Sequence, residues 1–84
     1  MIKILYFAQF REQLGIDSEQ IQLPRHVHTV ETLLAYLRGR GGNWTEVFGA
    51  DAVVCVAVNH AMVAGQGTVA VGDEIAFFPP VTGG

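Results

Sequence analysis

The apolar residues of this chain recur with two different periods. Residues 2–7, IKILYF, are rich in branched and aromatic side chains, which is typical of a strand. A two-residue period divides them between two faces: Ile2, Ile4 and Tyr6 on one, and Lys3, Leu5 and Phe7 on the other. After a polar segment that contains Gly15, residues 18–24, SEQIQLP, alternate until Pro24 ends the run. This second pattern predicts a half-buried strand in a hairpin with the first.

The longer period predicts one main helix. Its apolar side chains recur at the three- and four-residue intervals of a single helix face: Val30, Leu33, Leu34 and Leu37. Thr29 can cap the start of this helix, and Glu31 lies favourably in its first turn. Glycines follow, and Asn43 can cap a short helical turn whose apolar side chains share one side: Trp44, Val47 and Phe48.

Three further strands are expected in the second half of the chain. Residues 53–58, VVCVAV, form a continuous apolar run, which predicts a deeply placed central strand. Asn59 and His60 are expected to form a two-residue turn into a short strand, AMV, residues 61–63. A Gly-Asp turn then precedes EIAFF, residues 74–78, whose alternation places two side chains, Ile75 and Phe77, opposite Glu74, Ala76 and Phe78.

Four or five strands with one main helix predict an α+β fold. In this arrangement, the helix packs on one face of a mixed sheet and the short helical turn packs beside it. A helix placed early, between pairs of strands, points to the ubiquitin-like β-grasp. We therefore expect one β-grasp domain, residues 1–80, followed by a flexible tail, residues 81–84.

Composition and charge exclude several classes of function. The chain has 84 residues, half of them apolar, and a formal charge of -3 from five basic and eight acidic residues. No basic run offers a footprint for a phosphate backbone, so nucleic acid is not an expected partner. No stretch is long and apolar enough for a signal segment or a membrane span, so we expect a cytoplasmic protein without a membrane partner.

The residues that usually bind metals or carry redox chemistry are sparse. Cys55 is the only cysteine, which excludes an intramolecular disulfide, and its apolar neighbours predict a place in the core. His26 and His28 would share a face of an extended segment, but no third ligand lies near them in the sequence. We therefore expect neither a metal site nor a cofactor bound by this chain.

The chain ends in PPVTGG, residues 79–84, and this ending carries the main functional hypothesis. Pro79 and Pro80 remove two ladder donors and so end sheet pairing. The residues that follow them have no evident packing role: Val81, Thr82, Gly83 and Gly84. Six extended residues span at most about 20 Å, enough to reach inside another protein. The plain alternative is a frayed terminus.

The chemical group at the end of this tail is a carboxylate. Its ordinary pKa of about 3.5 leaves it ionised and poorly electrophilic at neutral pH. Adenylation with ATP by a partner would create a leaving group, and sulfur delivered to the acyl-adenylate would then give a thiocarboxylate. This route requires no catalytic residue in the domain itself.

Exposed apolar residues near the tail predict a docking surface. Lys3 and Glu74 mark an outward face of the sheet, on which further apolar side chains are expected to lie: Leu5, Phe7, Phe78 and Met62. Arg11 can pair with an acidic group on a partner, although a plain surface role fits it equally well. The alternative for the apolar residues is a second small core under a loop.

Three segments of the sequence resemble the small, sulfur-carrier subunit of molybdopterin synthase: GDEIAFFPPVTGG, MIKILYFAQFRE and VAVNHAMV. The resemblance implies a ubiquitin-like β-grasp in which the C-terminal glycine, here Gly84 preceded by Gly83, becomes a thiocarboxylate. The residues expected to contact a partner are Phe7, Arg11, Met62, Phe78, Pro79, Pro80, Val81 and Thr82. The chain would then be the sulfur-donating subunit of a heteromeric sulfurtransferase, with no independent catalytic site.

The same resemblance implies several partners. A ubiquitin-activating-enzyme-like adenylyltransferase would use ATP, and a sulfur donor protein would supply the sulfur. The large catalytic subunit, in a two-plus-two heterotetramer, would bind precursor Z (cyclic pyranopterin monophosphate) and receive the tail. Two sulfurs would form the dithiolene of molybdopterin. Three alternatives stay open: a ubiquitin-like modifier joined to lysines through Gly84, a sulfur carrier for thiamine synthesis, and an interaction domain with an unmodified end.

Overall fold

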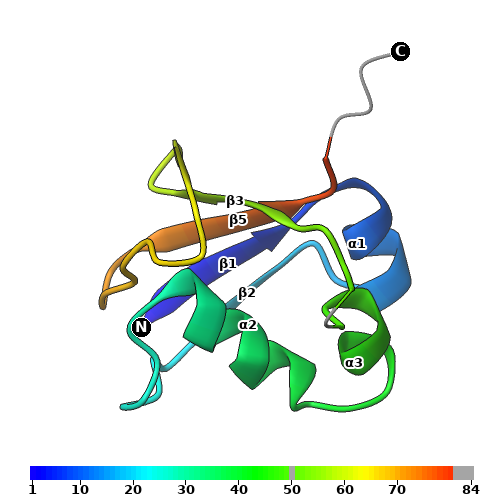
Figure 1. Ribbon diagram of the computed structural model, residues 1–84, viewed down its shortest axis with the longest axis horizontal. Helices are drawn as coiled ribbons and strands as arrows, with labels where there is room; N and C mark the ends of the chain where they lie inside the picture. Colours follow the sequence, from blue (N-terminus) through cyan, green and yellow to red (C-terminus); the bar gives the residue numbers. More distant parts are fainter. Residues whose placement is uncertain (50, 81–84) are drawn as a thin grey trace.

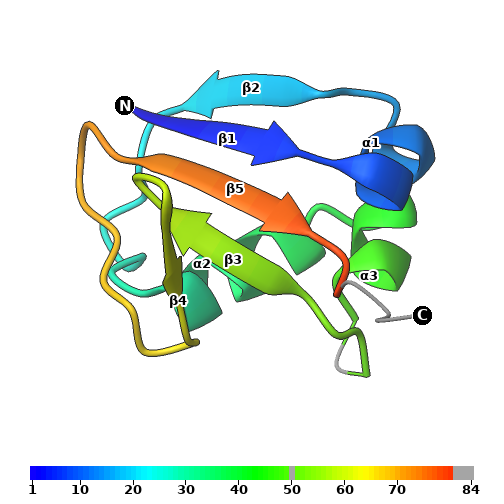
Figure 2. The same ribbon diagram turned by 90° about the horizontal axis from the view of Figure 1, so that it is seen from above.

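The computed structural model describes residues 1–49 and 51–80, and in them a mixed sheet is covered by helices on one face (Figures 1 and 2). The elements in chain order are β1 (Ile2–Tyr6), α1 (Ala8–Leu14), β2 (Ser18–Ile21), α2 (Val30–Arg38), α3 (Asn43–Val47), β3 (Cys55–Val58), β4 (Ala61–Val63) and β5 (Glu74–Phe78). The sheet has five strands in the order β2-β1-β5-β3-β4. This architecture confirms the predicted α+β class.

The central pair of the sheet joins the two ends of the described chain. β1 and β5 are parallel, with Ile4 opposite Ile75 and Tyr6 opposite Phe77, while all other neighbouring strands are antiparallel. These four side chains are buried against the helices, so the predicted alternation of both strands is confirmed. The largest fully buried side chains are Tyr6, Phe48, Phe77, Ile2, Ile4, Leu33, Leu37, Ile75, Val27 and Val30.

Helix α2 begins where the sequence predicts. The Thr29 hydroxyl accepts a hydrogen bond from the Thr32 backbone N–H at 3.2 Å, and the Thr32 hydroxyl accepts one from the Thr29 N–H at 2.9 Å. This reciprocal capping satisfies two donors that the first turn leaves unpaired. Leu33 and Leu37 are fully buried under the sheet. The predicted helix face is therefore confirmed.

Helix α1 is absent from the sequence prediction, which treats residues 8–14 as part of a polar segment. The helix makes only two turns and has one buried side chain, Phe10, so it shows little apolar periodicity. It ends at Gly15, whose φ of 78° is left-handed and whose N–H donates to the Arg11 carbonyl at 2.9 Å. β1 and β2 are antiparallel neighbours as predicted, but the polar segment that joins them forms a helix.

Strand β3 is shorter and less central than expected. It begins at Cys55, opposite Phe78, and β5 rather than β3 occupies the middle of the sheet. The ladder between β3 and β5 ends at this pair because Pro79, the residue after Phe78, has no N–H to donate. Val53 consequently lies outside the strand and is 68% exposed.

Asn43 does not cap α3 with its side chain. Gly42 occupies the capping position, and Asn43 is the first residue of the helix. Its Nδ2 donates to the Gln13 carbonyl at 3.1 Å, which joins α3 to α1. The residue predicted to cap one short helix therefore connects two.

The predicted Asn59–His60 turn is confirmed. Both residues have left-handed φ angles, 51° and 72°, and asparagine tolerates this conformation better than most side chains. Asn59 Nδ2 donates to Asp73 Oδ1 at 3.0 Å, and Asn59 Oδ1 accepts from the Glu74 N–H at 3.0 Å. These bonds hold the turn against the start of β5, which explains how it forms without a glycine.

A charged cluster connects β2 to the end of α2. The Tyr6 hydroxyl donates to Glu19 Oε2 at 2.7 Å, and the Arg40 guanidinium donates to both Glu19 carboxylate oxygens at 2.8 and 3.1 Å. Arg40 also lies over the Trp44 ring, 4.4 Å from its centroid. Burial raises the pKa of Glu19, but the hydrogen bonds from Arg40 and Tyr6 and the Arg40 charge together hold it below its ordinary value.

Glu19→Gln is expected to remove an acid-sensitive part of the folding stability. Because the folded-state pKa of Glu19 lies below its unfolded value, the carboxylate stabilises the fold at neutral pH. This contribution is lost as the pH falls through the folded-state pKa. Urea unfolding from neutral to acid pH should show a steeper loss of stability in the wild type than in the variant. Parallel curves would contradict a stabilising role for this carboxylate.

Candidate functional site

The face of the sheet away from α2 carries a row of small and apolar side chains. We call it the outer face, and Figure 2 looks onto it with α2 behind the sheet. On β1, β5, β3 and β4 its residues are Lys3, Leu5, Cys55, Ala57, Met62, Glu74, Ala76 and Phe78, and β2 adds Ser18 and Gln20 at the edge. The strand register fixes this set, because residues directly opposite each other in neighbouring strands point to the same side.

The centre of the outer face is a floor of small side chains, with larger side chains on either side of it in the sheet. Ala76 lies opposite both Leu5 and Ala57, and Ala57 lies opposite Met62. Met62 is 63% exposed, so a large apolar side chain projects at one side of this floor. Exposed apolar side chains that gather on one face mark an interaction site more often than scattered ones do.

The outer face is continuous with the place where the chain leaves the sheet. We call Phe78, Pro79 and Pro80 the tail root; Pro79 is half-buried and Pro80 is exposed. Phe7 follows β1, is 44% exposed, and its N–H donates to the Phe77 carbonyl at 3.1 Å. Because β1 and β5 are parallel and end together, Phe7 lies beside the tail root. A partner seated on the outer face would therefore also contact the start of the tail.

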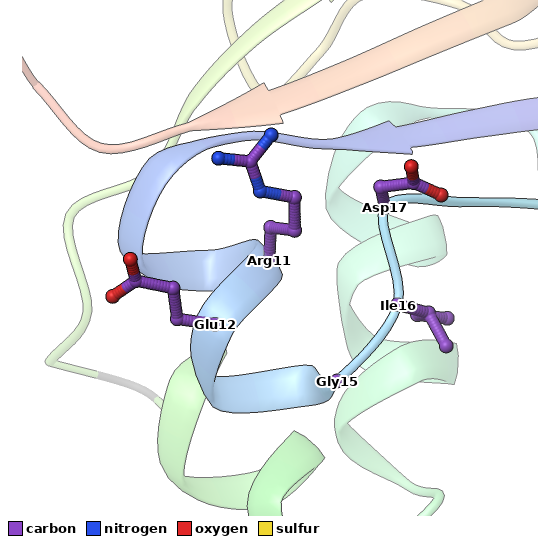
Figure 3. A pocket seen from close by; sticks show the side chains of 5 residues that line it. All are labelled: Arg11, Glu12, Gly15, Ile16 and Asp17. Atoms are coloured by element: carbon purple, nitrogen blue, oxygen red, sulfur yellow. The ribbon is translucent and has the colours of Figure 1, made fainter.

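Arg11 is an exposed cation at the same end of the molecule. It lines a shallow open groove with Glu12, Gly15, Ile16 and Asp17, and its side chain extends from α1 toward the end of β1 (Figure 3). Within residues 1–49 and 51–80 no carboxylate lies within salt-bridge distance of it. The expected contact of Arg11 with an acidic group of a partner stays a prediction from the sequence.

The predicted tail residues lie outside the described residues: Val81, Thr82, Gly83 and Gly84. Their assignment to a functional tail therefore stays a prediction from the sequence. The structure contributes the position and surroundings of Pro80, from which the tail continues.

The core position predicted for Cys55 is wrong. Val56 and Val58 point into the core, so Cys55 and Ala57 alternate to the outer face, where Cys55 is half-buried opposite Phe78. The sequence reasoning also missed Ala57 as part of the floor. The alternation of small and branched residues in CVAV was the available signal, but the continuous apolar run concealed it.

The described part of the chain offers no arrangement of metal ligands. His26 and His28 are both exposed, and no group of three His, Cys, Asp or Glu residues converges within residues 1–49 and 51–80. Over the same residues, no helix is long and apolar enough to span a bilayer.

Comparison with known proteins identifies relatives along the whole chain. The model of the ThiS family matches residues 4–84. The molybdopterin synthase sulfur carrier subunit of Haemophilus influenzae is 40% identical over 84 residues, which are 100% of both chains. The crystal structure of SAMP1 of Haloferax volcanii is 31% identical with a TM-score of 0.75, over 99% of this chain and 98% of that chain.

A more distant structure shares the fold. In a complex of subunits 1 and 2 of molybdopterin-converting factor from Helicobacter pylori, one chain has a TM-score of 0.66 at 21% identity, over 99% of this chain and 97% of that chain. These neighbours are ubiquitin-like β-grasp proteins, so the predicted β-grasp is confirmed.

Proposed function

Because this chain belongs to the ThiS family, we propose that it is the sulfur-carrier subunit of a cytoplasmic molybdopterin synthase. The observation that carries the proposal is the full-length match to a sulfur carrier subunit, which includes the C-terminal residues. The location of exposed apolar side chains around the tail root supports it, since a carrier must dock before it delivers.

The proposed chemistry takes place at the terminal carboxyl group of Gly84. A carboxylate oxygen attacks the α-phosphorus of ATP on an activating adenylyltransferase, and pyrophosphate leaves. The terminal sulfur of a persulfide on a donor protein then attacks the acyl carbon, and AMP leaves, which gives an acyl disulfide. A second thiol attacks the donor's sulfur in this acyl disulfide, the S–S bond breaks, a new disulfide forms on the donor side, and the thiocarboxylate is released. Two such deliveries to precursor Z in the large subunit would supply both sulfurs of the dithiolene.

In this scheme the folded domain acts as a docking module. The outer face seats the large subunit, and Phe7 and Arg11 add an apolar and a charged contact beside the tail root. The two prolines restrict the backbone where the tail begins, which lowers the entropy lost when the tail enters a narrow pocket. The six residues from Pro79 onward span at most about 20 Å, which bounds the depth of that pocket.

A ubiquitin-like modifier is the second candidate. The likeness to SAMP1, which is a small archaeal modifier protein, favours it. A modifier and a sulfur carrier share the first step, adenylation of the C-terminal glycine, and differ in the nucleophile that follows. An amine gives an isopeptide bond, whereas sulfur gives a thiocarboxylate.

Intact-mass measurement of the chain isolated from its source tests the proposal. Replacement of one carboxyl oxygen by sulfur adds about 16 mass units, and fragmentation should place this atom on Gly84. A chain that lacks Gly84, isolated in parallel, is the control and should carry no added sulfur. Adducts on lysines of other proteins would favour the modifier. A chain that stays unmodified while molybdopterin is being made would contradict the carrier function.

Cys55→Ala is expected to leave sulfur transfer intact. Cys55 is the only thiol of the chain and lies on the outer face opposite Phe78, so a persulfide there is the obvious rival to a terminal thiocarboxylate. In the proposed mechanism, the sulfur is bonded to the acyl carbon of Gly84 and never to this side chain. Reconstituted synthase with the variant should convert precursor Z at the wild-type rate, within a factor of about two. Loss of the added sulfur from the intact mass would assign the cargo to Cys55.

A further inference from the structure

The cations of this chain are almost all arginines. The sequence has one lysine, Lys3, and four arginines, Arg11, Arg25, Arg38 and Arg40. Lysine becomes a nucleophilic amine when it loses its proton, whereas the guanidinium of arginine stays protonated in proteins. This difference matters for a protein whose own carboxyl terminus is activated, because an acyl-adenylate reacts with amines.

Lys3 lies at the end of the sheet opposite the tail root. It is opposite Glu74, the first residue of β5, whereas the tail continues from the far end of that strand. At about 3.3 Å per residue, the six steps along the chain from Glu74 to Pro80 span about 20 Å. Met1 lies at the same end as Lys3, as the N label in Figures 1 and 2 shows.

The remaining chain is too short to bring the terminus comfortably back to Lys3. Four residues follow Pro80, and they span at most about 14 Å when fully extended. A lysine side chain adds about 6 Å, so the carboxyl group of Gly84 would meet the Lys3 amine only if the tail reversed direction and stretched completely. A reversed and fully extended path is a small fraction of the conformations open to any four-residue segment.

Arg11, in contrast to Lys3, lies close to the tail root. Helix α1, which contains Arg11, follows β1 directly and lies at the tail-root end of the sheet beside β5 (Figure 2). Its side chain is exposed and extends toward the end of β1 (Figure 3). An amine at this position would be well within the span of a six-residue tail.

We infer that the fold protects its activated carboxyl terminus from its own amines: the cation beside the tail root, Arg11, cannot be acylated, and the single side-chain amine, Lys3, lies out of easy reach. Arg11 thereby keeps a positive charge for docking without competing with the sulfur donor. This inference rests on the proposed function, in which Gly84 is activated as an acyl-adenylate.

The competing reaction is simple aminolysis. The neutral amine attacks the acyl carbon of Gly84, an amide C–N bond forms, the bond from that carbon to the leaving group breaks, and the amine proton passes to solvent. From the adenylate the leaving group is AMP, and from a thioester it is a thiol. An internal lactam results, and the terminus is lost to sulfur transfer.

A C-terminal thioester of the full chain, released from an intein fusion by a small thiol, tests the geometry without any activating enzyme. Arg11→Lys and Arg25→Lys make the same chemical change at the two ends of the sheet, because Arg25 follows β2 near the start of β1. Intact mass distinguishes the lactam, which is about 18 mass units lighter than the hydrolysed acid.

Arg11→Lys should form the lactam at least about tenfold faster than Arg25→Lys or the wild type, because the local concentration of the amine is higher. In concentrated guanidinium chloride this difference should disappear, since only the fold separates the two positions. Equal rates in the folded state would overturn the inference, as would a wild type that cyclises through Lys3 as fast as Arg11→Lys.

A parallel reaction with ATP and the adenylyltransferase of the same organism tests the proposed function separately. Hydroxylamine should convert the activated wild type into a hydroxamate about 15 mass units heavier than the acid. If no hydroxamate forms, the proposed activation is wrong, and with it the reason for protection, whatever the thioester shows. If hydroxamate forms but the two lysine variants cyclise alike, only the inference fails.

Discussion

Removal of Gly84 is expected to abolish sulfur transfer and to leave the stability of the domain unchanged. The shortened chain still ends in a glycine carboxylate, that of Gly83, but this group falls about 3.5 Å short of its normal reach. Misplacement of a reacting group by even about 1 Å can cost 100-fold in rate, so transfer should fall by at least that factor. Conversion of precursor Z by the reconstituted synthase measures it.

The deletion of Gly84 is not expected to change the stability of the folded domain. Among residues 1–49 and 51–80, every fully buried large side chain lies between Ile2 and Phe77, so the described core already forms a continuous set without the tail. The free energy of unfolding in urea is expected to change by less than about 0.5 kcal/mol. A larger loss would mean that the tail packs against the domain.

A chain of full length with a C-terminal amide separates length from chemistry. It keeps the reach of the tail but lacks the carboxylate oxygen that adenylation requires. It should be as inactive as the deletion variant. Wild-type activity of the amide would show that the terminal carboxyl group is not the site of sulfur loading.

Phe78→Asp is expected to weaken binding to the large synthase subunit far more than it weakens the fold. Phe78 is half-buried on the outer face at the tail root, where a partner would cover it. Burial of a charge at the centre of an interface typically costs about 2 kcal/mol or more, which is about 30-fold in the dissociation constant. Isothermal titration calorimetry with the purified large subunit measures this loss.

The adjacent residue provides the matched control. Phe77 points to the opposite face, is fully buried, and lies 5.4 Å from the Phe48 ring and 6.1 Å from the Tyr6 ring, between centroids. Phe77→Ala should therefore reduce the free energy of unfolding by about 3–5 kcal/mol. Binding per folded molecule should change little. If Phe78→Asp instead destabilises the domain as much as Phe77→Ala and leaves binding unchanged, the outer face is not the docking surface.

Phe77 and Phe78 lie on opposite faces of the sheet, and the two faces have different expected roles. Its inner side chains pack under α2 and hold the fold, while its outer side chains stay available around the tail root. In the proposed function the chain would visit several partners with one tail, and a docking surface next to that tail would serve all of them. Each partner then needs only one contact area to align the terminal carboxyl group.

The sequence pattern alone predicted the structure of those segments whose apolar residues recur with a clear helical or strand period. The alternation of β1 and β5 and the face of α2 with its Thr29 cap follow from neighbouring residues, because strand and helix periods are local properties of the backbone. The proline and glycine composition of the last six residues likewise predicts the end of the sheet without reference to the rest of the fold.

Only the tertiary structure decided the features that depend on partners distant in the sequence. Helix α1 has one buried anchor, so packing rather than periodicity specifies it, and Cys55 joins the outer face because its strand pairs with β5. The Tyr6, Glu19 and Arg40 cluster and the location of Arg11 at the tail root also require strands and helices to meet. The physical reason is that the periodicity of a segment shows which face of its own helix or strand a side chain occupies. Which residues from other segments lie beside that face depends on how the strands pair, above all β1 with β5.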